Sequence, residues 1–399
     1  MNSIKTLLLG ATGLALAHSA SAQITIRIAG SNGDRAATTQ AIQNLLVGET
    51  YAGIDPTPTK SNFSNFTGGT FGVGGPAVNV KTAFIGATGG IKAVAGSETV
   101  RFLPNGATGT ANGNPLTDAN PHEDAVPDFG VSTNFQSTSP YQGIYNGHTY
   151  ITLTEVLTGV VALNFVASPG FPADNLTTAQ AQALYTGGAI PLAFFTGSPA
   201  DHNKTVFALG RNSDAGQRYG AQAEIGIGVN AVVKQYQPTV SGTTATSHVL
   251  WPRETFSGVD SNFAGNGGYS SGALLAGGLT LTLGPNAYHV GNPSATAGYY
   301  IGYVTPSDAA TAVTGGATVL KWNGITYSQT AIEEGQYTAW LYTRVIYDPN
   351  LAGTVRTFAD AIASEVAANT IVNPGGGIKL DNLQVTRNSE SGPLGANYF

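Results

Sequence analysis

The chain has 399 residues, no cysteine and only 10% charged residues, with 17 basic side chains against 23 acidic ones. This acidic balance argues against a nucleic-acid partner, because phosphate backbones are bound by basic surfaces. The lack of cysteine excludes disulfides, thiolate metal sites, cysteine nucleophiles and a lipid-modified N-terminal cysteine. The length suggests two domains, each able to bury a core without disulfides.

The first 22 residues have the pattern of a secretory signal peptide. Lys5 supplies a positive charge, residues 7–17 are apolar, and residues 20–22 form a small-residue cleavage site. The apolar stretch is too short to span a membrane, and no later segment offers about 18 consecutive apolar residues. We therefore predict a periplasmic or secreted protein without a membrane span, whose mature chain begins at Gln23.

Three segments of the chain share the order strand, small-residue loop, helix. Their predicted strands cover 23–29, 78–85 and 205–209, their loops 30–34, 86–90 and 210–216, and their helices 35–47, 91 onward and 217–223. This unit points helix N–H groups at a ligand, particularly at an anion. The alternation of strands and helices predicts an α/β protein with mixed or parallel sheets.

The rest of the chain is less regular. Long stretches rich in glycine, asparagine, threonine and phenylalanine cover 57–77, 96–121 and 237–278. Loops of this length are either functional or insertions with their own strands. Leu279–Leu283 alternates leucine with threonine and is predicted as one such strand. Near the C-terminus, 339–347 is strongly apolar, and 354–368 has the spacing of an amphipathic helix.

A series of short motifs follows in order along the chain. They lie at Gly86–Ile91, Asp128–Ser132, Val160–Phe165, Asn175–Gly187, Arg211–Gln217, Tyr300–Val304, Trp322–Gly324 and Ile332–Tyr337. In this order they resemble type 2 periplasmic substrate-binding proteins, in the phosphate-binding branch that serves ABC importers. For example, 175–187 is similar to the family's NLT-x-x-Q-x-x-x-I-(Y/F)-x-G helix.

The resemblance implies a two-lobed α/β fold of the periplasmic-binding-protein type, with Gly/Asn-rich insertions and a hinge that the chain crosses twice. Lobe I would comprise 23–158 plus 318–399, and lobe II 159–317. Such proteins hold a small oxyanion such as phosphate between the lobes and pass it to an ABC permease. Helix N-termini, hydroxyls and an arginine suffice for this, so neither a catalytic step nor a cofactor is expected.

The ligand-binding residues that the resemblance implies are Asn32, Gly33, Asp34, Thr88, Thr133, Arg211, Gly216 and Gln217. Arg211 matches the family's anion-binding arginine, and Gly216 matches a glycine that lets the backbone approach the ligand. Thr88 keeps the hydroxyl of a family serine. Each also has a simpler interpretation: Arg211 as a surface ion-pair residue, Thr88 and Thr133 as helix-capping hydroxyls, and Asp34 as a helix N-terminal charge.

Other positions depart from the family pattern. Thr133 replaces the aspartate that would accept a proton from phosphate, while Ala215 and Gln217 replace a serine and a threonine. Losing the acceptor carboxylate removes the group that would disfavour a fully ionised anion such as sulfate. We therefore predict weaker and less selective phosphate binding than is typical of the family, with sulfate or another anion competing.

Two other classes of function remain as alternatives. A structural or surface-displayed protein could keep the same scaffold without anion binding, since the altered loops and long Gly-rich stretches would suit it. A hydrolase is disfavoured, although Gly268–Gly272 matches G-x-S-x-G, because no apolar strand precedes it and no acid lies between Ser270 and His289.

Acidic residues surround His122 in the sequence. They are Asp118, Glu123, Asp124 and Asp128. Their spacing fits no EF-hand loop, so a solvated acidic loop is predicted and a metal site is not. The chain is predicted not to be an enzyme.

Overall fold

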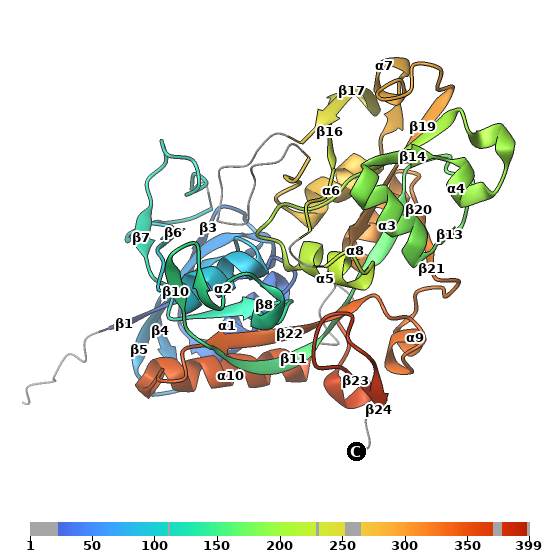
Figure 1. Cartoon of the computed structure of the whole chain (residues 1–399). Coiled ribbons are helices and arrows are strands. Elements are labelled where there is room, and N and C mark those ends of the chain that lie inside the picture. Colours follow the sequence, from blue (N-terminus) through green and yellow to red (C-terminus); the bar gives the residue numbers. More distant parts are fainter. Residues whose placement is uncertain (1–22, 111, 229–230, 252–264, 370–376, 397–399) are drawn as a thin grey trace, which may run out of the picture.

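The computed structural model describes residues 23–110, 112–228, 231–251, 265–369 and 377–396. Two β-sheets with helices packed against them form two lobes, which lie side by side in Figure 1. The predicted α/β architecture is confirmed, with both parallel and antiparallel strand pairs. Within these ranges, no helix is long and apolar enough to cross a membrane. The predicted signal peptide lies outside them.

The first lobe is built on an eight-stranded sheet. In spatial order its strands are β11 (Thr154–Ala162), β22 (Trp340–Tyr347), β8 (Phe129–Ser132), β1 (Ile24–Gly30), β5 (Ala77–Ala83), β4 (Phe63–Phe71) and β2 (Leu46–Val47), with β3 (Thr50–Gly53) paired to β4. β1 pairs in parallel with β5 and β8, whereas β22 runs antiparallel to β8 and β11. Successive residues of β8 and β22 are buried, as expected for strands covered on both faces.

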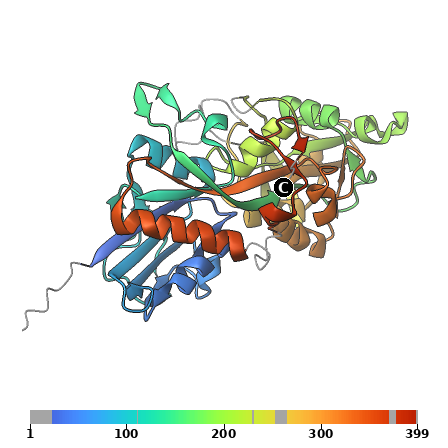
Figure 2. The ribbon, with the colours of Figure 1, turned by 90° about the horizontal axis from the view of Figure 1, so that it is seen from below.

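Helices cover both faces of this sheet. α1 (Arg35–Leu45) and α10 (Gly353–Asn369) share a core with the strands on one face, and α2 (Ala87–Gly96) packs on the other. Figure 2 shows α10 lying along the sheet. Phe358, Ile362 and Val366 of α10 are buried, and each contributes about 1.5–3 kcal/mol to folding. The predicted amphipathic helix is thereby confirmed.

The second lobe is built on a five-stranded sheet. Its order is β14 (Ala189–Pro191), β15 (Lys204–Ala208), β19 (Ala297–Val304), β12 (Asn164–Ala167) and β20 (Thr318–Val319). Helices α3 (Thr178–Gly187) and α5 (Gly216–Glu224) belong to one core cluster, and α6 (Gly272–Leu279) and α8 (Pro306–Thr314) belong to another. Short helices α4 (Ala193–Thr196), α7 (Pro285–Tyr288) and α9 (Gln329–Glu333) complete this part of the chain.

Shorter strands pair outside the two main sheets. They are β6 (Val100–Phe102) with β7 (Glu123–Ala125), β9 (Gly143–Tyr145) with β10 (His148–Tyr150), β13 (Asn175–Leu176) with β21 (Lys321–Trp322), β16 (Tyr236–Ser241) with β17 (Thr244–Leu250) and β18 (Thr282–Leu283), and β23 (Val385–Thr386) with β24 (Gly395–Ala396). The stretches predicted as loops or insertions therefore carry strands. The first of them, 57–77, contributes β4 to the main sheet and is not an insertion.

The chain passes between the sheets along two paired strands. β11 leaves the first sheet and continues through Leu163 into β12, while β22 returns antiparallel to β11. The predicted boundary after residue 158 lies inside β11, and the one before 318 lies at β20, which pairs with β12. The lobe boundaries themselves stay a prediction.

The C-terminal segment 377–396 contacts both lobes. Val160 and Ile378 exchange backbone hydrogen bonds of 2.9 and 2.8 Å. The buried carboxylate of Glu390 accepts a hydrogen bond of 2.7 Å from the Phe135 N–H. Arg387 lies 3.6 Å from Glu224 on α5. This segment thus packs beside the crossing strands β11 and β22, with β23 and β24 near α9 in Figure 1.

Two predicted elements differ from the structure. α2 begins at Ala87, so the predicted loop 86–90 forms its first turn. The glycine at position 90 reflects close packing of this helical turn against β1, because a Cβ on Gly90 would lie 2.6 Å from the Gly30 Cα. The strand predicted at 279–283 is reduced to Thr282–Leu283, because α6 extends to Leu279, which it buries.

Candidate functional site

The carboxyl ends of parallel strands in both lobes face a common space. In the first lobe, the residues after β1, β5 and β8 lead into Asn32, Gly86 and Thr133, respectively. In the second, β15 leads to Arg211 and β19 leads to Thr305. Crevices at the carboxyl ends of parallel strands are where α/β proteins bind ligands. Beside a third cavity of about 830 Å³, two adjoining cavities that share Arg211 occupy this position.

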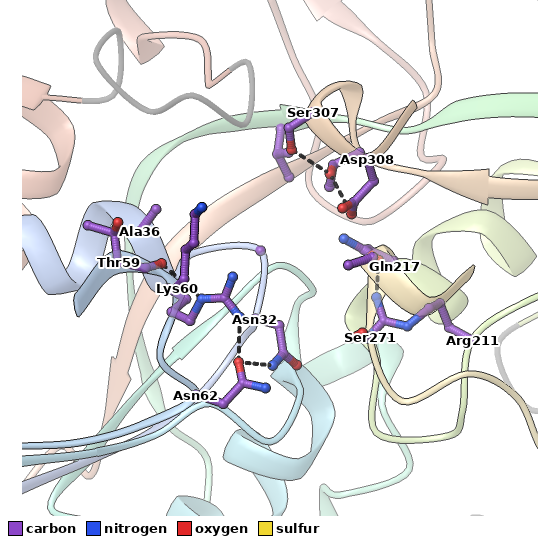
Figure 3. A pocket seen from close by; sticks show the side chains of 16 residues that line it. Asn32, Ala36, Thr59, Lys60, Asn62, Arg211, Gln217, Ser271, Ser307 and Asp308 are labelled. Atoms are coloured by element: carbon purple, nitrogen blue, oxygen red, sulfur yellow. Dashed lines mark hydrogen bonds between the residues drawn. The ribbon is translucent and has the colours of Figure 1, made fainter. Parts of the chain in front are cut away.

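The larger of these two, here called the outer cavity, has a volume of about 320 Å³. Its walls come from the start of α1, the segment 59–62, and the N-terminal ends of α5, α6 and α8. Arg35 and Lys60 come from the first lobe, and Arg211 and Asp308 come from the second. Figure 3 shows Lys60 on one side, Arg211 and Gln217 on the other, and Ser307 and Asp308 beside them.

The smaller one, here called the inner cavity, has a volume of only about 10 Å³, which is room for about one water molecule. It lies between the segments that contain Gly86, Thr133 and Gly216. A Cβ on Gly216 would lie 2.7 Å from Ala87 Cβ and from Asn134 Oδ1, and nearer still to Thr133 Oγ1. The glycine is therefore required for the lobes to approach each other here.

The structure brings together six of the eight predicted binding residues. Asn32, Gly33, Arg211 and Gln217 line both cavities, and Thr133 and Gly216 line the inner one. Asp34 and Thr88 line neither. Contact of these residues with a ligand stays a prediction.

Thr88 contacts the opposite lobe through its backbone. Its N–H donates to the Asp214 carbonyl oxygen at 3.0 Å, and its hydroxyl donates to Asn134 Oδ1 at 3.3 Å. The first turn of α2 is therefore capped by the second lobe, and the Thr88 hydroxyl is used within the first.

Asp34 lies buried behind the site. Its Oδ2 atom has no hydrogen-bond partner within the described part of the chain. Burial raises the pKa of Asp34 to about 8, although the Ser31 hydrogen bond and nearby Arg344 act to lower that pKa. Burial therefore disfavours the charged form of Asp34 at the start of α1.

Arg211 is 2% exposed and is held by the protein on three sides. Its Nε donates to the Tyr269 carbonyl at 3.0 Å, its Nη2 donates to the Ser270 carbonyl at 3.1 Å, and its Nη1 donates to Gln217 Oε1. Burial lowers the pKa of Arg211 to about 10, which leaves it positive at neutral pH. The simpler interpretation as a surface ion-pair residue is wrong because the side chain is buried.

Arg35 and Lys60 add positive charge that the sequence analysis did not assign to the site. Arg35 donates to the Thr59 carbonyl at 3.0 Å and to Asn62 Oδ1 at 2.5 Å. Burial lowers the pKa of Arg35, while Asp308 and Asp55 act to raise it. Among the residues that the structure describes, neither of these cations nor Arg211 forms an ion pair.

Asp308 is the carboxylate of the outer cavity. It stands in the first turn of α8 and accepts a hydrogen bond of 3.0 Å from Thr305 Oγ1. Burial raises the pKa of Asp308, while Thr305, Arg211 and Arg35 act to lower it. Its position could have indicated the site, because the apolar strand ending at Val304 is followed by Thr305 and Pro306. Pro at the first helical position marks a helix start, here at the sheet edge. Nothing in the sequence around Lys60 gives a comparable signal.

Of the acidic residues around His122, Asp118 and Asp124 are exposed, as predicted for a solvated loop, whereas Glu123 is mostly buried and paired with cations. Glu123 pairs with Lys81, and with Arg27 at 2.6 Å; Asp118 pairs with Arg101 at 2.6 Å. The described ranges contain no group of three or more side chains arranged to hold a metal ion.

No family model matches the chain, and no curated protein sequence matches it significantly. Solved structures are similar to it at low identity. An ABC-type phosphate transport receptor from Vibrio cholerae is 14% identical, with 88% of this chain and 99% of that one covered at a TM-score of 0.45. PstS from Borrelia burgdorferi is also 14% identical, with 90% and 99% covered at a TM-score of 0.41.

Over about nine-tenths of its length, the chain is similar to phosphate-binding proteins of ABC transporters, the class that its motifs resemble.

Proposed function

We propose that this protein binds a small oxyanion of the phosphate type between its lobes and acts as a solute-binding protein. One observation carries the proposal: Arg211 is buried and positive, lines both cavities, and has no carboxylate partner in the described structure. An uncompensated buried charge is costly, so proteins pair such groups. An anion between the lobes would supply the missing partner.

The other charged residues of the outer cavity also favour a negatively charged ligand. Arg35 and Lys60 join Arg211 there, against the single carboxylate of Asp308. The N-terminal ends of α1, α6 and α8 open on the same space, and each adds partial positive charge. With Asp308 ionised the side chains contribute a net charge of about +2, which matches a doubly charged phosphate group.

The site is proposed to bind its ligand without chemical change. Ser270 lies in a segment whose described residues before it, 265–269, contain one isolated bridge and no strand, unlike a nucleophile elbow. Its carbonyl oxygen accepts a hydrogen bond from Arg211. Export to the periplasm or to the medium, and delivery of the anion to an ABC permease, complete the proposal.

Titration calorimetry on residues 23–399 tests the proposal with phosphate and sulfate as probes. We expect binding of at least one anion, and at least tenfold weaker binding in Arg211→Gln, because hydrogen bonds to a charged group contribute about 1.5–3 kcal/mol. Arg356→Gln is the matched control, since Arg356 forms an exposed i,i+4 pair with Asp360 on α10. Circular dichroism and thermal unfolding would verify that both variants fold.

Failure of every anion to bind the folded wild-type protein would overturn the proposal and favour a structural role for the scaffold. Equal affinity in Arg211→Gln and the wild type would also contradict it.

A further inference from the structure

We infer that the ligand is an organic phosphate that carries hydroxyl groups, such as a phosphomonoester of a small polyol, instead of inorganic phosphate. This inference rests on the proposed anion site and identifies what else the outer cavity holds. Its basis is the size of that cavity and the placement of an acceptor carboxylate opposite the cations.

The outer cavity is too large for a simple tetrahedral anion. Its volume of about 320 Å³ is about thirty times that of the inner cavity, which has room for about one water molecule. Inorganic phosphate and sulfate have one central atom and four oxygens, so either would leave most of this space to water. The inner cavity, at about 10 Å³, is too small for either anion. A three- to six-carbon group attached to the phosphate would occupy the remaining volume.

The lining of the outer cavity is polar on more than one side. Arg35 and Lys60 lie on the first-lobe side, where Asn62 accepts from Arg35 and from Asn32. On the second-lobe side, Ser307 and Asp308 stand at the start of α8 (Figure 3). These side chains offer hydrogen bonds to hydroxyls, and Ala36, Val161 and Ala273 of the same lining can contact the carbon atoms of a ligand.

Asp308 favours ligands that carry hydrogen-bond donors over fully ionised anions such as sulfate. A polyol phosphate offers it several hydroxyls, whereas inorganic phosphate offers only its protonated oxygens. An ionised carboxylate only accepts hydrogen bonds and repels a fully ionised oxyanion. Its Thr305 partner provides one donor, at 3.0 Å to Oδ2, so the remaining acceptor positions suit donors from a ligand. A polyol phosphate supplies both requirements, because its phosphate faces the cations while its hydroxyls donate to Asp308.

Calorimetry with four probes tests the inference: inorganic phosphate, methyl phosphate, glycerol 3-phosphate and glucose 6-phosphate. We expect at least one polyol phosphate to bind tenfold or more tightly than inorganic phosphate and methyl phosphate. Tenfold is the size expected for one hydrogen bond to a charged group. Methyl phosphate is the matched control for the ester, because it lacks hydroxyls.

Asp308→Asn should change the two ester classes in opposite directions. The polyol phosphate should bind tenfold more weakly because its acceptor is weakened, and methyl phosphate should bind more tightly because a repulsive charge is gone. Ser307→Ala, at an exposed position, should weaken only the polyol phosphate, by severalfold, and serves as a second test if Asp308→Asn fails to fold.

The outcomes separate this inference from the proposed function. If inorganic phosphate binds as tightly as both polyol phosphates, the inference is wrong and the anion site stands. If both ester classes weaken equally in Asp308→Asn and Ser307→Ala, the hydroxyl recognition is wrong. If no probe binds, both the inference and the proposed function fail.

Discussion

The inner and outer cavities share Asn32, Gly33, Arg211 and Gln217, but they differ in what surrounds those residues. Around the inner cavity lie small residues and backbone, with Gly86, Ala87 and Gly216 packed closely across the lobes. Around the outer cavity lie Arg35, Lys60 and Asp308, whose charged groups are carried on longer side chains. In the inner region the backbones of the two lobes pack closely together. The outer region carries the charged side chains of the proposed anion site.

Because of this difference, the sequence motifs of a family can be present in a protein that binds another ligand. Glycines and small residues in the motifs fix how the backbone of each lobe approaches the other, since only they fit there. In the proposed site, charged side chains from the helix starts and from 59–62 would decide which ligand is bound. A scaffold can therefore persist while its ligand changes, and variants on either side of this division should separate the two roles.

Gly216→Ala should have the largest effect on binding. The new Cβ would overlap Ala87 Cβ and Asn134 Oδ1 at 2.7 Å, and overpacking of this kind costs about 1–3 kcal/mol. Because the overlap exists only where the lobes meet, we expect anion affinity to fall ten- to a hundredfold and the radius of gyration to increase. Calorimetry and small-angle scattering measure the two effects.

Gly277→Ala is the matched control for that substitution. Gly277 lies inside α6, and a Cβ there has open space around it. Alanine should therefore stabilise the helix by about 0.5–1 kcal/mol without changing the scattering profile. If Gly216→Ala behaves in the same way, the lobes do not need to approach closely to bind the anion.

Asp34→Asn should change how stability depends on pH. In the folded protein the pKa of Asp34 is raised to about 8 by burial, whereas its ordinary value is 3.8. Between these values the folded state binds the proton that the unfolded state has lost, so the free energy of unfolding falls as pH rises, by about 1.4 kcal/mol per pH unit at most.

Urea unfolding of the wild type at pH 6 and pH 7 should show this decrease, and Asp34→Asn should reduce it. An identical slope in the two proteins would show that Asp34 is already ionised, through closer pairing with Arg344 than the structure gives. The unchanged slope of Glu49→Gln, at a half-buried position between β2 and β3, would control for removal of a carboxylate in general.

The fold and the residues around the inner cavity could be predicted from the sequence for a physical reason. Alternating Ile24, Ile26 and Ile28 predict a buried strand, and the glycines beside the strand ends mark where backbone approaches backbone. Both signals are local. The outer half depends on Lys60 and Asp308, which are 248 positions apart in the sequence and meet only through the packing of two lobes.

Local pattern also misled at two points. The run Gly86–Gly90 indicates a flexible loop, but its glycines are there because a Cβ at Gly90 would overlap Gly30. The leucine–threonine alternation at 279–283 predicts a strand, but Ser271 caps α6 and the helix continues to Leu279. In both cases tertiary packing decided between conformations that the sequence alone permits.

Lys60→Gln should give the smallest effect, and it sharpens the comparison most directly because Lys60 lines only the outer cavity of the pair. A partly solvated cation near an anion contributes about 0.5–1 kcal/mol, so affinity should fall two- to fivefold at low salt. Ionic screening should reduce this difference further at 0.5 M salt, where the Debye length is only about 4 Å.

Lys321→Gln, which removes an exposed cation paired with Asp174 at 2.7 Å, should leave affinity unchanged. If both lysine variants bind as the wild type does at low salt, the anion does not interact with Lys60, and the other cations of the outer cavity, Arg35 and Arg211, must hold it.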